Sequence, residues 1–570
     1  MKHRLTLESA LWITVAAVAV LFRMIHLSQP GLNDSEAQIA LQAASLAGGS
    51  SVLSASHPLY VLLTGAMFAL LGPTTFLARL LPALAGAGIA GVLYLGRKYL
   101  GRQVSLLAAF LAAVDPGFVA ASRQADSPMP GMLLLFLFLV LFLNRKHKLA
   151  GAVLGLGLLS GLHFWQGFVL LAVTTGLYML ITGRSFEPWL AGAKKLAVEF
   201  FLQKGWISFL AAILLVGTLM FTFPGGAGEV LAGLTAYWQG WGAAFKDSIT
   251  QYVLLLPSYE LLFVAAGIGY GIHSILRGNR RSQVLMLSFL LALILTLVYP
   301  ARNVLDMVWV VLPLLLLASD AIYALVRLSQ DNWLPSAGLG LAVAILVTFA
   351  LYSGLLIFTQ GIGGQNMEIR IISLLGALVV AAILIILMAW AWSGPTGVAG
   401  LGMGLLALGV CYTIGQSYRA AGLGAFPEQE LWRNSSRIVH PELLVSTLES
   451  ISAWNNGTTN DTSIAVIDVD SPSLHWELRN FKRTDFYSAF PAGDNPEIVI
   501  TSIQSSPASS FSYTGQDLEW NSDAEWGSLT SQEWLNWYLK RSIPVVSKTV
   551  IVWGRTDIMP VGQSGTGELP

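Results

Sequence analysis

The first candidates for chemistry are the carboxylates near the start of the chain. The segment Asn33-Asp34-Ser35-Glu36 comes directly before a helical pattern of apolar residues. A carboxylate held beside an acceptor hydroxyl can remove its proton as a general base. The same spacing is typical of a helix start, with Asp34 or Ser35 as the capping residue and an acid after it. Spacing alone favours the cap, and a catalytic role for Asp34 or Glu36 is the alternative.

A second acid stands beside an arginine in the segment Arg123-Gln124-Ala125-Asp126. Arg123 and Asp126 are three residues apart, so they could pair with each other on one helical turn. The alternative is that they form one wall of a site for an anionic substrate. Arg79 and Arg302 are further isolated arginines, and a phosphate is a natural partner for such side chains. A lipid headgroup bound without turnover explains them equally well.

Other candidates have a simple structural explanation beside the functional one. Asp115 lies in an apolar run, where an ionisable residue is a functional candidate unless its side chain reaches the membrane surface. Trp165 suits the aromatic belt of a membrane protein, and its neighbour His163 suits either a buried polar position or a substrate contact. Tyr60 and Tyr299 are further candidates for substrate contacts. No metal-ligand cluster, phosphate-binding glycine loop or nucleophile elbow stands out in the sequence.

The elements that must position these residues are membrane-spanning helices. Apolar residues make up 55% of the 570 residues and charged residues 11%, against roughly 25% charged in a soluble domain. Apolar runs of about 18 residues or more can each cross a bilayer. We predict about thirteen spans, which begin near Leu11, Arg79, Val104, Pro128, Leu149, Gly167, Trp206, Pro257, Gln283, Asn303, Ala337, Arg370 and Gly397. The predicted fold class is therefore mainly α, a polytopic membrane helix bundle. The net charge of zero suggests no nucleic-acid partner.

The distribution of Lys and Arg predicts the orientation in the membrane. Connections on the side of the N-terminus are rich in these residues, whereas the opposite side has Arg23, Arg79, Arg123, Lys246, Arg302 and Arg370. Basic residues concentrate on the cytoplasmic side, so we expect a multi-pass plasma-membrane protein with a cytoplasmic N-terminus. The apolar stretch 58–71 is short for a span. Treating it as interfacial preserves the charge bias.

The composition changes after residue 417. From there to the end the chain is polar, with β-rich runs at 464–469, 498–503 and 545–553 and helical patterns at 441–454 and 532–541. An odd number of spans places this part outside the cell. We therefore predict two domains, a membrane domain over 1–417 and a small extracytoplasmic α/β domain over 418–570.

The order of these motifs resembles a known group of membrane enzymes. The acid-containing segment GLNDSEAQIAL is followed by the block HPLYVLLTGAMFALLGPTTFLARLLPAL and then by DPGFVAASRQADSPMPGMLLLF. This arrangement resembles the GT-C superfamily of glycosyltransferases, nearest to the lipid A aminoarabinose transferase and protein O-mannosyltransferase group. The later block SPSLHWELRNFKRTDFY resembles a segment of a bacterial and archaeal branch associated with flippases and N-glycosylation.

The resemblance implies a membrane enzyme with a lipid-linked donor. It implies an inverting transfer of a sugar from a polyprenyl-phosphate donor to a hydroxyl or amide of a glycan, lipid or protein acceptor, on the extracytoplasmic face of the bilayer. No cofactor is certain, and a divalent metal is one option.

The resemblance also implies roles for residues of this chain. Asp34 takes the place of the base, with Asp126 as the second acid, and His57 takes that of the basic residue that contacts the donor phosphate. Arg79 and Arg302 fall where arginines contact the phosphate or support the site, and Arg123 joins this phosphate-binding set.

One departure from the family pattern concerns the base. The pattern has Asp-Glu followed by Ala, whereas here Ser35-Glu36-Ala37 aligns best and Asp34 is displaced by one residue, about 100° around a helix. Either Asp34 still reaches the acceptor because it precedes the helix, or Glu36 is the substitute base; otherwise the fold is kept and the reaction lost.

Two further functions stay open. The displaced acid favours a catalytically inactive lipid-sugar binder or a partner of a flippase. A transporter is less well supported, because transporters bind substrate near the bilayer midplane and often show internal repeats. The charged candidates here gather at one surface.

Overall fold

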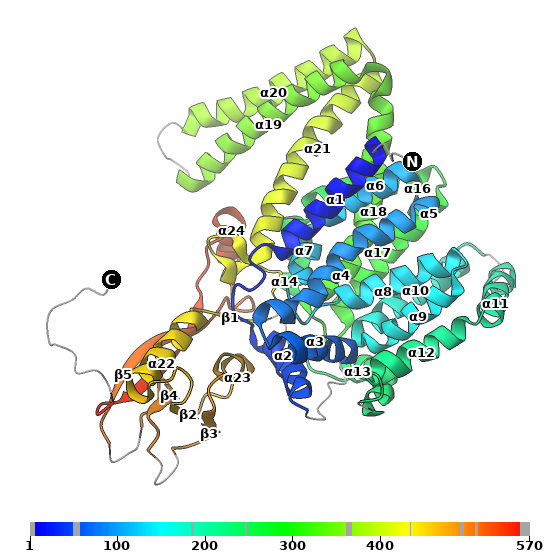
Figure 1. Cartoon of the computed structure of the whole chain (residues 1–570). Coiled ribbons are helices and arrows are strands. Elements are labelled where there is room, and N and C mark those ends of the chain that lie inside the picture. Colours follow the sequence, from blue (N-terminus) through cyan, green and yellow to red (C-terminus); the bar gives the residue numbers. More distant parts are fainter. Residues whose placement is uncertain are drawn as a thin grey trace.

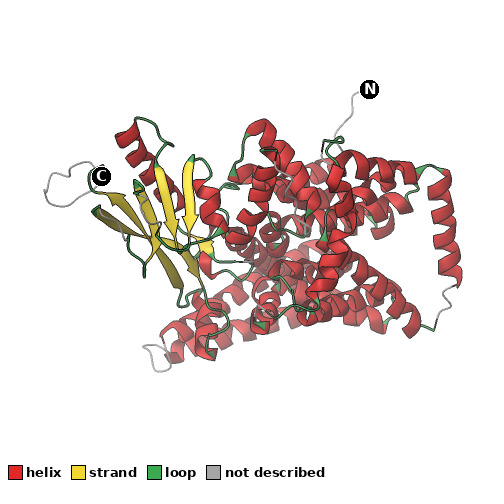
Figure 2. Ribbon diagram, turned by 90° about the horizontal axis from the view of Figure 1, so that it is seen from below, coloured by secondary structure: helices red, strands yellow, loops and turns green. Residues whose placement is uncertain are grey.

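The computed structural model describes residues 6–49, 57–183, 187–222, 224–245, 248–360, 367–433, 435–490, 495–507 and 511–558. A bundle of helices fills most of the molecule, and a sheet with its own helices lies at one end (Figure 1). Figure 2 shows this sheet beside the bundle from a second direction. The predicted class, a mainly α membrane bundle with a small C-terminal strand-containing domain, is confirmed.

The bundle is built from long apolar helices and shorter connecting helices. The first half contains α1 Leu7–Met24, α2 Asp34–Ala47, α3 Pro58–Leu71, α4 Thr75–Leu95, α5 Arg97–Leu100, α6 Arg102–Val114, α7 Pro116–Ser122, α8 Met129–Leu143, α9 His147–Leu159 and α10 Leu162–Ile181. The second half contains α11 Glu187–Leu202, α12 Gly205–Gly217, α13 Ala232–Gly240, α14 Ile249–Tyr259, α15 Leu261–Phe263, α16 Gly269–Leu276, α17 Arg280–Val298, α18 Val308–Ser329, α19 Trp333–Gln360, α20 Met367–Ala391 and α21 Gly394–Tyr418.

The helix lengths support a multi-pass membrane protein. Among the described residues, 7 helices are long and apolar enough to cross a membrane, or up to 10 if each of three bent pairs is one span. The apolar helices α3, α8 and α9 are shorter. The count of thirteen and the orientation of the termini therefore stay predictions. An interfacial position for α3 also stays a prediction, and this helix packs across α2 at the end of the bundle near the sheet (Figure 1).

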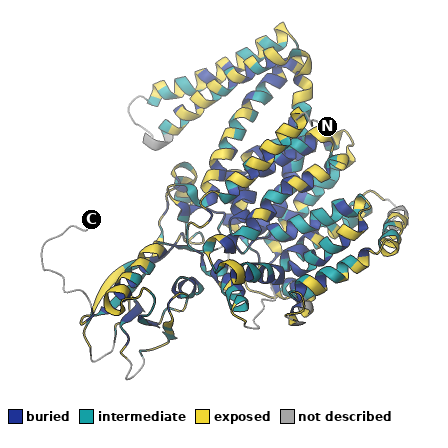
Figure 3. Ribbon diagram, viewed as in Figure 1, coloured by how far each residue is buried: buried dark blue, intermediate teal, exposed yellow. Residues whose placement is uncertain are grey.

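The hairpin of α19 and α20 projects away from the rest of the bundle (Figure 1). Exposed residues run along both of its helices (Figure 3). Many of these residues are large and apolar, including Leu351, Ile372 and Trp390, whose exposed fraction is 87%. Apolar surface of this extent is stable in lipid and not in water, so these faces are in contact with the bilayer.

The C-terminal sheet has six strands in the order β1-β5-β6-β4-β2-β3. They are β1 Arg437–Ile438, β2 Ser463–Ile467, β3 Arg483–Tyr487, β4 Ile498–Ser502, β5 Tyr513–Asp523 and β6 Val546–Arg555. β2 pairs in parallel with β3 and β4, and the other pairs are antiparallel. The predicted runs correspond to β2, β4 and β6, and the predicted helices to α22 Pro441–Asn456 and α24 Ser531–Lys540. The division at residue 417 remains our proposed boundary.

One short helix, α23 Pro472–Leu478, attaches the C-terminal domain to the bundle. The side chain of Trp476 is fully buried, and its ring packs against Phe68 of α3 with 5.8 Å between centroids. Its indole Nε1 donates to Thr75 Oγ1 at 3.3 Å. The guanidinium of Arg479 covers the ring at 4.0 Å and donates to the carbonyl of Pro73 at 3.1 Å. An anchor of this kind fixes the domain over α2 and α3.

We expect Trp476→Ala to loosen the C-terminal domain. Truncation of a buried tryptophan costs about 3–5 kcal/mol, and here the lost contacts join two domains. Limited proteolysis should therefore release the C-terminal domain faster from the variant than from the wild type. Trp454→Ala is the matched control because that side chain is 67% exposed. Equal cleavage of the two variants would refute the anchor.

Candidate functional site

The N-terminus of α2 is capped by a residue that sequence reasoning did not choose. Asn33 is the N-cap, and its side-chain Oδ1 accepts from the Glu36 amide at 2.9 Å. Glu36 Oε2 accepts from the Asn33 amide in return, at 3.2 Å. The predicted cap is confirmed as a feature, but the capping residue is Asn33 and not Asp34 or Ser35. The reciprocal pair satisfies two backbone donors that a helix start leaves open.

Glu36 is held in a buried ion pair. Its side chain is 2% exposed, and Arg79 donates from Nε to Oε1 at 2.8 Å and from Nη2 to Oε2 at 2.7 Å. The backbone amide of Ala125 also donates to Oε1, at 2.9 Å. Both carboxylate oxygens are thus used to hold three segments together, so the geometry favours a structural role for Glu36 over the predicted one of substitute base.

The two arginines expected to bind phosphate are also used within the protein. Besides Glu36, Arg79 donates to the carbonyls of Leu27, Pro30 and Gly31. Arg123 donates to the carbonyls of Phe22, Arg23, Ile25, His26 and Ala421. A guanidinium has five N–H donors. The bonds of Arg79 take up all five, and those of Arg123 use Nε, Nη1 and one N–H of Nη2. We therefore revise the expected phosphate-binding role of Arg79 and Arg123 to one of fixing the loop after α1. The expected pair of Arg123 with Asp126 is replaced by these carbonyls and by His57.

Asp34 lies at the contact with the C-terminal domain. It is the first residue of α2, half-buried, and its Oδ1 accepts from the backbone amide of Ser473 at 3.1 Å. Ser473 is in α23, the anchoring helix. Asp34, which is displaced by one residue from the acid of the family pattern, thus makes a contact that joins the two domains.

A cluster of histidines and carboxylates lies at the ends of several helices. His57 precedes α3, and its Nε2 lies 3.0 Å from Asp126 Oδ1 in the loop before α8. The ring of His57 stacks on His163 in the first turn of α10, with 5.4 Å between centroids. His163 Nδ1 lies 3.2 Å from Asp306 Oδ1. We call His57, Asp126, His163 and Asp306 the His–Asp cluster. Two imidazoles, each beside a carboxylate, can accept, donate and stabilise charge in a proton transfer.

Asp306 is the member that sequence reasoning missed. It belongs to a short turn at Val304–Met307, where its Oδ2 accepts from the amide of Asn303 at 3.1 Å in a capping box. This capping box leaves Oδ1 facing His163. The spacing Asn303-x-x-Asp306 is a capping signal in the sequence, but nothing local connects it to His163, which lies 143 positions earlier.

Three members of the cluster have donors suited to a metal ion. One ligand atom each from His57, Asp126 and His163 lies within 4.8 Å of the other two. Two imidazoles and a carboxylate suit zinc or a similar divalent ion. The expectation of no metal ligands missed this group, because its members are far apart in sequence.

Aromatic residues surround the cluster. Tyr299 donates to the carbonyl of Tyr237 at 3.1 Å, and the two rings stack at 5.3 Å. Burial, with the nearby Asp306 carboxylate, raises the pKa of Tyr299 above its ordinary value. Tyr60 donates to the carbonyl of Ala78 at 2.7 Å, and burial, followed by the charge of Glu36, raises its pKa. Both phenols therefore stay protonated and act as hydrogen-bond donors.

The remaining predicted residues make other contacts than those that join the His–Asp cluster. Arg302 donates to the carbonyl of Leu297 at 2.8 Å and lies 4.9 Å from the ring of Phe245. Trp165 packs its ring on Phe168 at 6.0 Å. Asp115 is fully buried and caps α7 through the amide of Phe118 at 2.7 Å. The structure thus brings together His57, Asp126 and His163 from the predicted set, and places Asp34 and Asp115 elsewhere.

Comparisons with known proteins agree with this fold. Residues 56–203 match the family model described as dolichyl-phosphate-mannose-protein mannosyltransferase. The crystal structure of ArnT from Cupriavidus metallidurans bound to undecaprenyl phosphate is 14% identical, with a TM-score of 0.52, and covers 96% of this chain and 99% of that chain. The apo structure of the same protein is 15% identical, with a TM-score of 0.53 and the same coverage. No curated protein matches the chain.

Proposed function

We propose that this chain, which has the fold of the GT-C superfamily of membrane glycosyltransferases, transfers a sugar from a polyprenyl-phosphate donor to an acceptor. The acceptor group is a hydroxyl or amide of a glycan, lipid or protein, and the transfer takes place on the extracytoplasmic face with inversion. The His–Asp cluster is the observation that carries the proposal. The undecaprenyl phosphate bound to the similar ArnT fold supports the choice of donor.

Asp126 is the base that the geometry supports best. In an inverting transfer the hydroxyl oxygen or amide nitrogen of the acceptor attacks the anomeric carbon and its proton passes to a carboxylate. The bond from the anomeric carbon to the phosphate oxygen breaks, and polyprenyl phosphate leaves. The side chain of Asp126 is 18% exposed and is oriented by His57, so it is both accessible and fixed. Glu36 is 2% exposed and ion-paired, and Asp34 already accepts a hydrogen bond from the C-terminal domain.

The remaining members of the site have supporting roles in the proposal. His57 and His163 supply N–H groups beside the place where charge develops on the leaving phosphate, which lowers the barrier. Asp306 holds His163 at 3.2 Å and makes it a better donor. Tyr60, Trp165 and Tyr299 line the approach as substrate contacts, Arg302 remains a candidate for the phosphate, and Asp115 remains a candidate for a more distant substrate contact.

We expect the transfer to need no added metal. His57 Nε2 already lies 3.0 Å from Asp126 Oδ1, so this pair can take part in the proton transfer without an ion between them. Millimolar EDTA should leave the transfer rate within about twofold, since the carboxylate acts directly as the base. Micromolar Zn²⁺ should inhibit, because it competes for the histidines and for Asp126. Loss of activity in EDTA and its restoration by a divalent ion would instead make the metal a cofactor.

A catalytically inactive binder is the second candidate function. The engaged Glu36 and the displaced Asp34 favour it, since these are the residues where the family pattern places catalysis. Such a protein binds a polyprenyl-phosphate sugar without consuming it. Association with a flippase is one use of that binding.

Donor consumption in proteoliposomes tests the proposal. The purified chain is reconstituted with a panel of polyprenyl-phosphate sugars, and release of polyprenyl phosphate is followed with extracts of the host envelope as the acceptor. Nucleotide sugars serve as the comparison donors. We expect at least one polyprenyl-phosphate sugar to be consumed and no nucleotide sugar. Binding of the lipid donors without release, across the full panel, would support the inactive binder.

A further inference from the structure

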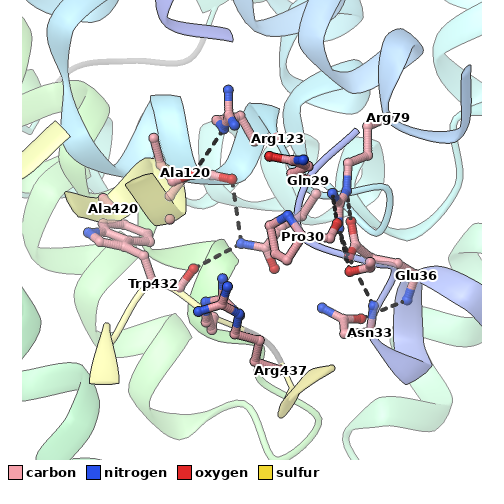
Figure 4. Close-up of a pocket in the computed structure, with 15 residues that line it drawn as sticks. Gln29, Pro30, Asn33, Glu36, Arg79, Ala120, Arg123, Ala420, Trp432 and Arg437 are labelled. Atoms are coloured by element: carbon pink, nitrogen blue, oxygen red, sulfur yellow. Dashed lines mark hydrogen bonds and ion pairs between the residues drawn. The ribbon is translucent and has the colours of Figure 1, made fainter. Parts of the chain in front are cut away.

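A pocket between the bundle and the C-terminal domain has an excess of positive charge. Glu36 is the only carboxylate among the described residues that line it. The arginines that line it are Arg79, Arg123, Arg433 and Arg437. Arg123 and Arg437 approach from opposite sides of this group of residues (Figure 4). Glu36 already neutralises Arg79, and Arg123 is satisfied by carbonyls. The pocket therefore differs from a balanced ion-pair network, because the remaining arginines, Arg433 and Arg437, face no further carboxylate among the residues that line it.

The charge of Arg433 has no partner within the described part of the chain. No hydrogen bond or ion pair joins its side chain to any residue that the structure describes, and its guanidinium lies beside the backbone of Gly422. Burial, together with the neighbouring Arg437, lowers the pKa of Arg433 to about 10. The group stays protonated near neutral pH. Arg433 is half-buried, so its charge is partly desolvated, and an anionic ligand offsets that cost.

Arg437 has spare capacity too. One bond joins its Nη1 to Glu428 Oε2 at 3.3 Å, while its Nε is buried without a partner among the described residues. The hydroxyl of Ser435, between the two arginines in sequence, is also buried without such a partner. Two N–H forks and a hydroxyl facing one space match the oxygens of a phosphate.

The two residues before Arg433 are held by hydrogen bonds to the helix bundle. The amide of Leu431 donates to the hydroxyl of Tyr259 at 3.1 Å, and its carbonyl accepts from Gln251 at 3.2 Å. The side chain of Trp432 is fully buried, and its carbonyl accepts from Gln124 at 2.9 Å. Because the two residues before Arg433 are held by the bundle, the backbone at Arg433 needs little ordering when a ligand binds.

Arg433 and Arg437 also line a second pocket, of about 230 Å³, which continues toward the sheet. Its other polar groups include the carboxylates of Glu430, Asp523 and Glu525. Burial raises the pKa of Glu430 and of Asp523. Carboxyl groups suit the hydroxyls of a sugar, and the arginines suit a phosphate. The arginine end of this pocket therefore suits a phosphate, and the carboxylate end suits the hydroxyls of a sugar in the same ligand.

We propose that Arg433 and Arg437 form a binding site for a phosphorylated saccharide, with the phosphate against the two arginines and the sugar hydroxyls toward Asp523 and Glu525. The biological role of this site rests on the proposed function. The binding itself does not, since a phosphorylated saccharide can bind without sugar transfer. The phosphate could come from a lipid-carried sugar or from a water-soluble phosphorylated glycan. The chemistry of recognition is the same in both cases.

Ligand-induced thermal stabilisation of the full-length protein in detergent tests the site. The probes are glucose 1-phosphate, inorganic phosphate and glucose, at constant ionic strength. We expect glucose 1-phosphate to raise the unfolding midpoint more than inorganic phosphate does, and glucose to have little effect. Arg433→Gln and Arg437→Gln should each weaken the binding of glucose 1-phosphate at least about tenfold, as expected for the loss of a charge-assisted bond. Arg483→Gln is the control, because Arg483 is exposed on β3 and pairs with Asp461.

A second arm identifies the source of the phosphate. Undecaprenyl phosphate in phosphatidylcholine vesicles is added as a competitor of glucose 1-phosphate, with undecaprenol as its control. If undecaprenyl phosphate displaces glucose 1-phosphate from the wild type but not from Arg433→Gln, the site belongs to the lipid-carried sugar. If glucose 1-phosphate binds and undecaprenyl phosphate does not displace it, the site belongs to a soluble phosphorylated glycan. The proposal is overturned if the wild type binds none of the phosphate probes, or if both variants bind them as the wild type does. Neither readout depends on sugar transfer, so an inactive protein can still pass this test.

Discussion

Replacing Asp126 by asparagine is expected to lower the rate of sugar transfer by about 10²–10⁴-fold, the range for loss of a general base. The substitution keeps the size of the side chain and removes its ability to take up the acceptor proton. The change is not expected to disturb the fold, because His57 can still donate to the side-chain oxygen at this position. The rate is measured as polyprenyl phosphate released per protein in proteoliposomes, with donor binding measured separately.

The control for this prediction is the same substitution at Asp34. The carboxylate of Asp34 accepts from Ser473, and an amide oxygen at this position keeps that bond. We therefore expect Asp34→Asn to cost less than about tenfold in rate. If instead Asp34→Asn is inactive and Asp126→Asn is active, the base is Asp34, as the family resemblance implies.

The second large effect is expected from breaking the buried pair of Glu36 and Arg79. Arg79→Gln leaves a buried carboxylate without its cation, and loss of one partner of a buried ion pair costs about 3–5 kcal/mol. The free energy of unfolding should fall by this amount, with a lower thermal midpoint and a lower yield of monodisperse protein. Glu36→Gln should behave in the same way, since it leaves the buried guanidinium of Arg79 without its counter-charge.

Removal of an exposed ion pair provides the comparison. Arg555 and Asp557 lie 2.7 Å apart on the surface of the C-terminal domain, and exposed pairs contribute about 0–1 kcal/mol. Asp557→Asn should therefore leave the thermal midpoint nearly unchanged. If Arg79→Gln is as stable as Asp557→Asn but loses donor binding, Arg79 contacts the phosphate and our structural assignment is wrong.

The helix bundle could be predicted from the sequence because hydropathy is a local property. Apolar runs mark helices such as α4, α17 and α20 directly, and short β-rich runs mark β2, β4 and β6. The long strand β5 was missed, because its residues are mostly polar and its exposed face lacks the alternation that marks a half-buried strand. Pairing with β6 determines this strand instead.

The contacts of the site could not be predicted from the sequence, because the role of each residue depends on which distant residues the fold brings next to it. His57 and Asp126 were both candidates, but their contact joins residues 69 positions apart. Arg79 was expected at a phosphate, and its five bonds within the protein appear only when the loop after α1 folds over it. Arg433 drew no attention, since nothing local distinguishes an arginine that lacks a partner.

A structure of the Asp126→Asn variant with a polyprenyl-phosphate sugar bound would test the central claim most directly. The account predicts that the anomeric carbon faces the side chain at position 126, with room between them for an acceptor hydroxyl, and that His57 and His163 flank the bond to be broken. A sugar whose anomeric carbon faces Asp34, or lies away from all four members of the His–Asp cluster, would contradict it.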